Sequence, residues 1–233
     1  MKPKDFMGIF KKNTGTVQSI ENPFDDLHVI KLDFPKKLHW EAGEHGVFTI
    51  PDHKISGKPF RAFSVASVPE EGNMMIATDD NNPTSSFKQA LFHLSVGEKV
   101  TVRGPFGWFK VQDQTSPIVL ISTGIGITPM RALVKKLEHD QTRPIILIYA
   151  SPTGYLFKDL FNAVAQKNKQ FTPIYTKNRE DTIRAYTDLA RTLQNDAFYY
   201  ISGKTGTIKN IKKELKSAGI KRARMITDPY FGY

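Results

Sequence analysis

Three short stretches of the sequence place residues that bind anions beside serine or glycine. The first is RAFSVAS, residues 61–67, which sets Arg61, Phe63 and Ser64 in a run that otherwise has the small apolar side chains of a strand. A guanidinium group matches two phosphate oxygens at once, so Arg61 is a candidate phosphate ligand. The alternatives are a surface ion pair for Arg61, a core position for Phe63 and a plain strand position for Ser64.

The second stretch is NNPTSSFKQ, where Ser85 and Ser86 open a predicted helix directly after a strand. The first N–H groups of a helix have no partner inside the helix and attract negative charge. We expect Arg61 and this helix start to hold one pyrophosphate from two sides. Each charge-assisted hydrogen bond of this kind contributes about 1.5–3 kcal/mol.

The third stretch is ISTGIGITPM, in which a predicted strand ends at Thr123 and Pro129 begins a helix. Gly124 and Gly126 lie between them, so N–H groups at the helix start face a gap without side chains, which suits a phosphate. Pro129 stands where a dinucleotide-binding G-x-G-x-x-G pattern has its third glycine. A tight turn without a ligand is the alternative.

The three stretches lie in two parts of the chain that have different predicted secondary structure. Up to residue 113, short strand candidates alternate with Pro, Gly and Asp/Asn turns and one helix, which predicts an antiparallel β-barrel. These strands are 14–20, 28–34, 46–50, 61–67, 73–78 and 98–104, with the helix at 85–94. From residue 114, apolar runs alternate with amphipathic helices, as in a doubly wound parallel α/β fold. We therefore predict an α/β protein of two domains, 1–113 and 114–233.

Composition excludes several classes of function. The 233 residues include no cysteine, so disulfides, thiolate catalysis and cysteine-ligated iron–sulfur or zinc sites are ruled out. The six histidines show no ligand spacing, so we predict no metal site. The apolar runs are too short to span a bilayer and the first residues lack the apolar run of a signal peptide. We expect a cytoplasmic protein without a membrane span.

The net charge of +10 lies entirely in the second half of the chain. Residues 1–113 hold 14 basic and 14 acidic residues, whereas residues 114–233 hold 19 and 9. A predicted helix at 207–218 buries a stripe of Ile208, Ile211 and Leu215. Its outer side carries Lys209, Lys212, Lys213 and Lys216. This side is either a solvated face or a docking surface for an acidic protein. We expect no nucleic-acid binding, because exposed aromatics and nucleic-acid motifs are missing.

In order and in type, these stretches resemble the motifs of the ferredoxin–NADP reductase superfamily along nearly the whole chain. RAFS is similar to its Arg-x-Tyr-Ser flavin motif, EAGEHGVFTI to the strand before that motif, and SSFKQAL to its flavin-phosphate helix. GPFG, TGIGITP and YYISGKTGT resemble the motif that closes the barrel, the nicotinamide loop and a late strand that carries Cys-Gly in plant-type members. The ending DPYFGY is similar to the aromatic endings of some bacterial members.

The resemblance implies a flavin-dependent oxidoreductase that moves hydride from NAD(P)H to FAD and passes electrons to a protein such as ferredoxin or flavodoxin. It implies that Arg61 binds the FAD pyrophosphate, that Phe63 lies against the flavin ring and that Ser64 bonds near flavin N5. Ser85 and Ser86 would hold phosphates at the helix start. The pyridine-nucleotide pocket would be formed by Thr123, Gly124, Gly126, Thr128 and Gly203.

The sequence departs from the family pattern at two positions, and two further expectations concern Tyr233 and the choice of nucleotide. Phe63 replaces the usual tyrosine, and Ser202 stands at the position of the plant-type cysteine. Tyr233 would cover the flavin face and gate nicotinamide, or else simply pack between the domains. The strand at 144–151 ends without a carboxylate, and Lys177 and Arg179 are placed to meet a 2′-phosphate, which favours NADPH over NADH.

Three alternatives stay open at this point. FMN could replace FAD, since the phosphate grip serves either. The chain could be the reductase component of a multi-protein oxygenase system. It could also be a non-enzymatic basic module that binds nucleic acid.

Overall fold

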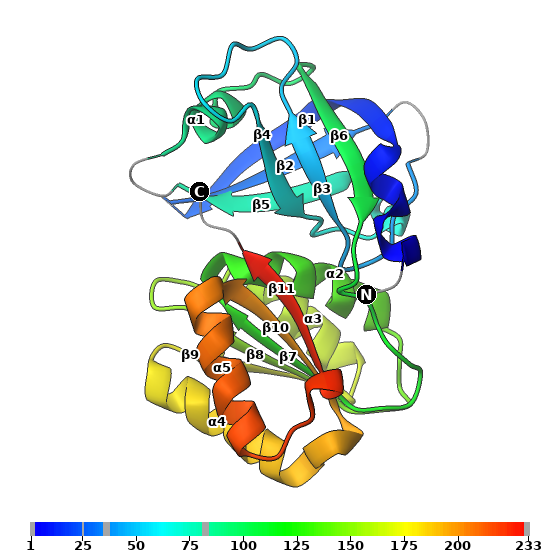
Figure 1. Cartoon of the computed structure of the whole chain (residues 1–233), viewed down its shortest axis with the longest axis vertical. Helices are drawn as coiled ribbons and strands as arrows, with labels where there is room; N and C mark the ends of the chain where they lie inside the picture. The colour runs from blue at the N-terminus through cyan, green and yellow to red at the C-terminus, as the bar shows by residue number, and fades with distance from the viewer. Residues whose placement is uncertain (1–2, 25, 35–37, 81–83, 231–233) are drawn as a thin grey trace. The chain divides into compact units, whose positions relative to one another are not determined.

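The computed structural model describes residues 3–24, 26–34, 38–80 and 84–230 (Figure 1). The chain divides into two compact units between Lys110 and Val111. Residues just before the predicted boundary form hydrogen bonds with the second unit, which explains why the division falls earlier than residue 114. The Gln112 N–H donates to the Tyr200 hydroxyl at 3.1 Å, and buried Arg143 donates to the Asp113 carbonyl at 2.7 Å.

The first unit is built on a six-stranded antiparallel sheet in the order β4-β3-β6-β1-β2-β5. The strands are β1 Lys12–Phe24, β2 Leu27–Asp33, β3 His45–Thr49, β4 Phe60–Ser64, β5 Met74–Asp79 and β6 Lys99–Phe106. The edge strands β4 and β5 approach each other through a bridge between Val65 and Ile76, so the sheet curls toward closure. The predicted β-barrel fold is confirmed.

Helix α1, Ser86–Phe92, packs its apolar side onto the core of this unit. The Ser85 hydroxyl caps the helix by accepting from the Lys88 N–H at 3.4 Å. Phe87 and Leu91 are fully buried in a cluster with strand residues such as Phe48. The first unit therefore has a core of its own.

The second unit is a five-stranded parallel sheet in the order β11-β10-β7-β8-β9. Its strands are β7 Ile118–Thr123, β8 Ile145–Ala150, β9 Phe171–Thr176, β10 Phe198–Lys204 and β11 Met225–Tyr230. Its helices are α2 Ile127–Leu137, α3 Lys158–Lys167, α4 Arg179–Leu193 and α5 Thr205–Ser217. The described residues also form short 3-10 helices: η1 Pro3–Phe10, η2 Pro69–Glu71, η3 Gly124–Gly126, η4 Gln194–Asp196 and η5 Arg222–Arg224.

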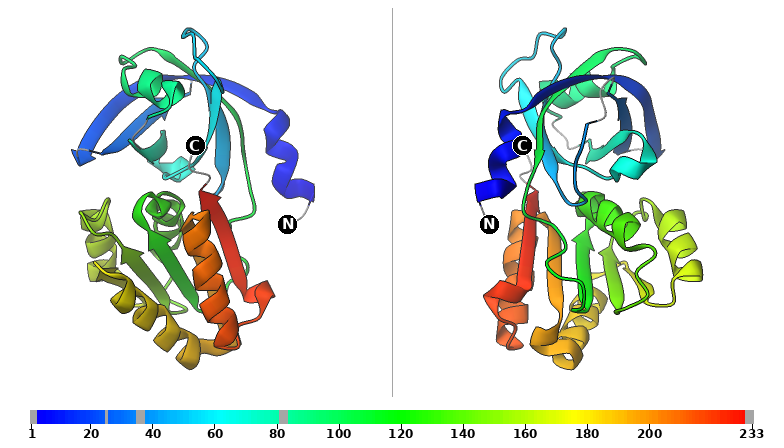
Figure 2. Two further views of the ribbon diagram at one scale, coloured as in Figure 1. Left: turned by 60° about the vertical axis from the view of Figure 1, so that its left-hand side comes forward. Right: turned by 90° about the vertical axis from the view of Figure 1, so that its right-hand side faces the viewer.

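Both faces of the parallel sheet are covered, as its apolar strands predict. Val119 and Ile121 of β7 lie in the core cluster beneath α4 and α5, which lie side by side (Figure 2). The alternate residues Leu120 and Ser122 are fully buried on the other face. The doubly wound α/β fold is confirmed.

The strand order of this sheet changes direction beside β7. The chain goes from β7 to β8 and β9 on one side, then returns to β10 on the other. Ligands of open α/β sheets bind outside the carboxyl ends of the strands at such a switch point. Among the described residues, no helix is long and apolar enough to cross a bilayer.

Candidate functional site

Two groups of predicted site residues lie in different units. In the first unit, Arg61 and Phe63 point to the same side of β4, because side chains two residues apart share a face. Both are buried, with exposures of 7% and 6%, and Ser64 is half-buried at the end of the strand. Arg61 is therefore not a surface arginine.

Arg61 lies beside the first turn of α1. One guanidinium nitrogen donates to the carbonyls of Lys58 and Phe60, at 3.1 and 2.8 Å. The guanidinium carbon lies 5.7 Å from the centre of the Phe87 ring. The Ser86 hydroxyl donates to the carbonyl of Ser56, which ties the same turn to the segment before β4. The structure thus places Arg61 near the helix start that carries the two predicted serines.

Phe63 packs within the core of the first unit. Its ring centre lies 5.6 Å from that of Phe48 and 6.3 Å from that of Phe87. Phe63 therefore occupies a core position, which was the alternative role considered for it from the sequence. Contact between Phe63 and a flavin ring stays a prediction.

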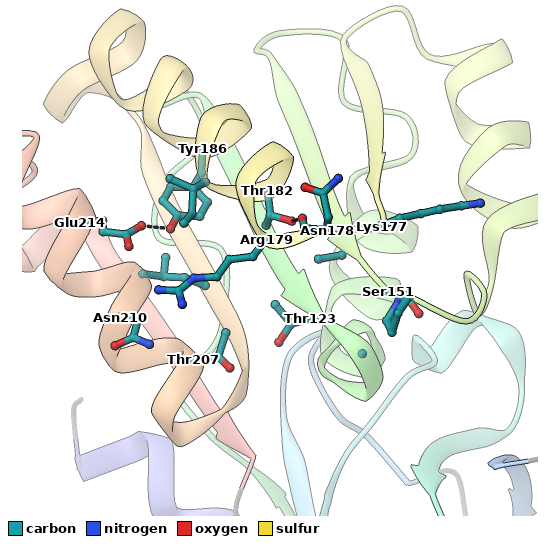
Figure 3. A pocket seen from close by; sticks show the side chains of 15 residues that line it. Thr123, Ser151, Lys177, Asn178, Arg179, Thr182, Tyr186, Thr207, Asn210 and Glu214 are labelled. Carbon is teal, nitrogen blue, oxygen red and sulfur yellow. Dashed lines mark hydrogen bonds between the residues drawn. The ribbon is translucent and has the colours of Figure 1, made fainter.

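In the second unit, a pocket of about 380 Å³ opens at the carboxyl ends of β7, β8 and β9 (Figure 3). Four of the predicted residues line it: Thr123, Gly124, Lys177 and Arg179. The lining residues that the sequence did not predict as site residues are Ala150, Ser151, Pro152, Asn178, Thr182, Ile183, Tyr186, Thr207, Asn210, Ile211 and Glu214. The pocket therefore lies between the strand ends and the facing sides of α4 and α5.

Gly126 and Gly203 lie behind Thr123, where the ends of β7 and β10 meet. A Cβ atom on Gly126 would lie 2.5 Å from the Ser202 carbonyl oxygen, and one on Gly203 would lie 2.3 Å from Thr123 Oγ1. Gly203 also has φ of +154°, which L side chains rarely adopt. Glycine at these two positions therefore leaves room for the Ser202 carbonyl beside Gly126 and for the Thr123 side chain beside Gly203.

Thr128 lies at the start of α2, and the nucleotide contact that the resemblance implies for it stays a prediction. It is 3% exposed, and its hydroxyl donates to the Ile125 carbonyl at 2.8 Å. It therefore stabilises the turn between β7 and α2 and is not among the residues that line the pocket.

The two predicted cations of the pocket point in opposite directions. Figure 3 shows the Arg179 side chain reaching toward α5, on the side of Asn210 and Glu214, and the Lys177 side chain extending away from it. Asn178 between them caps α4 by accepting from the Asp181 N–H at 2.8 Å. Of these two side chains, that of Arg179 therefore lies toward the α5 wall of the pocket.

A tyrosine and a carboxylate form one wall of the pocket. The Tyr186 hydroxyl donates to Glu214, and burial together with this hydrogen bond raises the pKa of Tyr186. Tyr186 therefore remains protonated and holds the carboxylate in place. Thr207, Asn210 and Glu214 follow an i, i+3, i+7 spacing on one side of α5, a signal that could have identified them from sequence.

Tyr233, the predicted gate, lies outside the residues that the structure describes, and its role stays a prediction.

An antiparallel half-barrel unit, followed by a parallel α/β unit with a pocket at its switch point, defines the ferredoxin–NADP reductase-like fold. The cytochrome P450 reductase GcoB from Amycolatopsis has a TM-score of 0.81 at 18% identity, over 94% of this chain and 69% of that one. Ferredoxin–NADP⁺ reductase from Plasmodium falciparum, solved with 2′P-AMP, has a TM-score of 0.76 at 14% identity, over 95% and 97% of the chains. The fold implied by the sequence resemblance is confirmed.

Within this fold, residues 110–229 match the family model described as "Adenylate-forming reductase 03009, C-terminal domain", and the chain belongs to that family. A curated relative, the F subunit of the Na(+)-translocating NADH-quinone reductase from Shewanella putrefaciens, is 32% identical over 158 residues. That match covers 62% of this chain and 52% of the relative. The chain thus spans about half the length of that relative.

Proposed function

We propose that this chain is a flavin-dependent oxidoreductase that takes hydride from NAD(P)H onto FAD and passes the electrons to a protein acceptor. The observation that carries the proposal is the pocket at the carboxyl ends of β7, β8 and β9, beside the switch point of the second unit. Two features support it: glycines where β7 meets β10, and an arginine inside the pocket. The three similar proteins named above are each called a reductase, which agrees with it.

The first unit would hold the flavin. Arg61 offers a fixed guanidinium beside the first turn of α1, which suits a pyrophosphate, with Ser85 and Ser86 at the helix start. Half-buried Ser64 would donate a hydrogen bond near flavin N5, while Phe63 would border the ring from the core side. When bound, FAD would supply the redox chemistry by accepting a hydride and releasing electrons. FMN is the alternative, since it carries a phosphate that the same groups could hold.

The second unit would hold the pyridine nucleotide. Thr123 and Gly124 end β7 at the pocket, and Gly126 and Gly203 keep side chains out of the space behind them. Arg179 points into the pocket, where it would meet a phosphate of the nucleotide. Because no carboxylate follows β8, a ribose 2′-hydroxyl lacks the charged acceptor that favours NADH, so we propose NADPH as the better substrate and NADH as the weaker one.

The roles of the two cations in the pocket can be separated by mutation. We expect Arg179→Gln to lower kcat/KM for NADPH by about tenfold or more, which corresponds to the loss of one charge-assisted hydrogen bond. NADH should be used almost as before. Lys177→Gln is the matched control, since it removes the same charge from an exposed neighbour that points away. Steady-state kinetics with both nucleotides measure the effect, and a larger loss in the Lys177 variant would contradict the assignment.

The electron acceptor is proposed to be an acidic protein that docks on α5. Lys209, Lys213 and Lys216 are exposed and Lys212 is half-buried, whereas Ile208, Ile211 and Leu215 are buried as predicted. A reductase component of a multi-protein oxygenase system is the second candidate, favoured by the likeness to a cytochrome P450 reductase. We also propose that the reaction takes place in the cytoplasm, which fits a chain without cysteine.

A further inference from the structure

The 3-10 helix η1 is firmly docked on β6 of the first unit. A 3-10 helix has three residues per turn, so residues three apart share a side. On the side that faces β6, Gly8 approaches so closely that a Cβ atom would lie 2.0 Å from the Pro105 carbonyl oxygen. The N–H of Gly107 donates to the Asp5 carbonyl at 2.8 Å, and the N–H of Gly104 donates to the Lys11 carbonyl at 3.0 Å. Both ends of the helix are therefore held by hydrogen bonds.

A second side of η1 packs against aromatic rings. The ring centre of Phe6 lies 5.8 Å from that of Trp108 and 6.5 Å from that of Phe106. These contacts leave Phe6 39% exposed. The orientation of the helix about its own axis is thereby fixed.

The third side of η1 turns two apolar side chains outward. Met7 is 67% exposed and Phe10, three residues later, is 86% exposed. Because the helix is docked on its other two sides, this exposure is a property of the folded unit. Apolar side chains exposed together on one element mark interaction sites, whereas single exposed apolar residues need no explanation.

Cations adjoin these two side chains. Lys11 and Lys12 follow Phe10 directly, and both are exposed. Exposed Arg103 stands directly opposite Lys12 in the pairing of β1 with β6, so both side chains leave the sheet on the same side. Three exposed cations among the described residues therefore lie close to η1.

We propose that Met7, Phe10, Lys11, Lys12 and Arg103, here called the η1 patch, bind the surface of an anionic lipid bilayer. Apolar side chains that project together from a short helix enter the boundary between headgroups and acyl chains without needing a shaped pocket. Anionic headgroups attract the adjoining lysines and arginine. The attachment is peripheral, and it is independent of the proposed redox function because it uses none of the residues assigned to FAD or NAD(P)H.

The test measures binding of the purified full chain to vesicles that contain phosphatidylglycerol and phosphatidylcholine in equal parts. Co-sedimentation gives the partition constant, and tryptophan fluorescence, to which buried Trp40 and Trp108 beside Phe6 both contribute, reports on η1 through Trp108. We expect a blue shift on binding and a loss of binding at high salt. The double variant Met7→Ser with Phe10→Ser should lower the partition constant about tenfold or more. Replacing Lys11 and Lys12 by glutamine should lower it about fivefold for each residue.

Val96→Ser is the matched control, because Val96 is 74% exposed and lies in the turn before β6. The far end of that strand, which contacts η1, is roughly 23 Å away at about 3.3 Å per residue. This control should bind as the unchanged protein does, and equal thermal midpoints of all variants confirm that they fold. Absence of binding to the mixed vesicles overturns the proposal. Equal binding to phosphatidylcholine alone overturns it too, as does unchanged binding of the Met7 and Phe10 variant.

A protein contact in place of a lipid one would appear as self-association. If light scattering shows a dimer that the Met7 and Phe10 substitutions convert to a monomer, while vesicles remain unbound, the patch is an interface between copies and the lipid proposal is wrong.

Discussion

At the scale of single residues, the pocket of the second unit depends on glycines where strand ends meet. Gly203 and Thr123 are 80 positions apart in the chain, yet the Thr123 hydroxyl lies so close to the Gly203 backbone that a Cβ atom on Gly203 would be 2.3 Å from it. The φ of +154° at Gly203 adds a conformational cost for any other residue. The absence of a side chain at Gly203 is thus one feature of the sequence that this site requires.

Gly203→Ala should lower the free energy of unfolding by about 2–3 kcal/mol, because the new methyl group meets Thr123 and the backbone is strained. Affinity for the nucleotide should fall as well, since Thr123 lines the pocket and must shift. Urea unfolding and nucleotide titration measure the two effects.

Gly206→Ala is the control for this prediction. Gly206 lies in the first turn of α5 with open space around its Cβ position, so alanine there should be neutral or stabilising by about 0.4–1 kcal/mol. Similar effects from both substitutions would contradict the close approach at Gly203.

Which site residues could be predicted from sequence depended on their spacing along the chain. Thr123 and Gly124 were predicted because a strand end, glycines and a helix start stand next to each other. Tyr186 and Glu214 were missed because their contact joins residues 28 positions apart, through the packing of α4 on α5. The strand period places Arg61 and Phe63 on one side of β4, but it does not reveal that this side is buried.

At the scale of elements, α5 shows what periodicity predicts well and what it leaves out. The buried stripe of Ile208, Ile211 and Leu215 was predicted, and the structure confirms it. The helix begins at Thr205, two residues before the predicted start, because the extended backbone of Lys204 leads directly from β10 into the first turn. Periodicity predicted which residues of the helix are buried, but it does not show whether the basic outer side binds a partner.

Electron transfer to an acidic carrier such as flavodoxin should depend on this outer side. We expect the rate at low salt to fall about tenfold when Lys209 and Lys216 are replaced by glutamate, and its salt dependence to flatten. Stopped-flow measurement over a range of salt concentrations gives both quantities.

The matched control replaces Lys167 and Lys169, near the start of β9, with glutamate. Both lysines are exposed, so the net charge changes equally at a site away from α5. A rate that is independent of salt, or an equal loss in the control, would mean that α5 is a solvated face.

At the scale of the whole molecule, two units with separate cores would divide the two cofactors between them. The change from short strands to alternating strands and helices predicted both folds correctly. It placed the boundary at residue 113, whereas the structure divides at 110, because Gln112, Asp113 and Ser116 bond to Tyr200 and Arg143 of the second unit. A composition shift locates such a boundary only to within a few residues.

The proposed division of labour is tested most directly by anaerobic titration of the protein, reconstituted with FAD, while the visible flavin band is recorded. We expect the protein to bind FAD, and the band to bleach with NADPH and, at higher concentration, with NADH. An Arg61→Ala variant should retain little flavin. A protein that binds no flavin, or a bound flavin that neither nucleotide bleaches, would contradict the proposed hydride transfer.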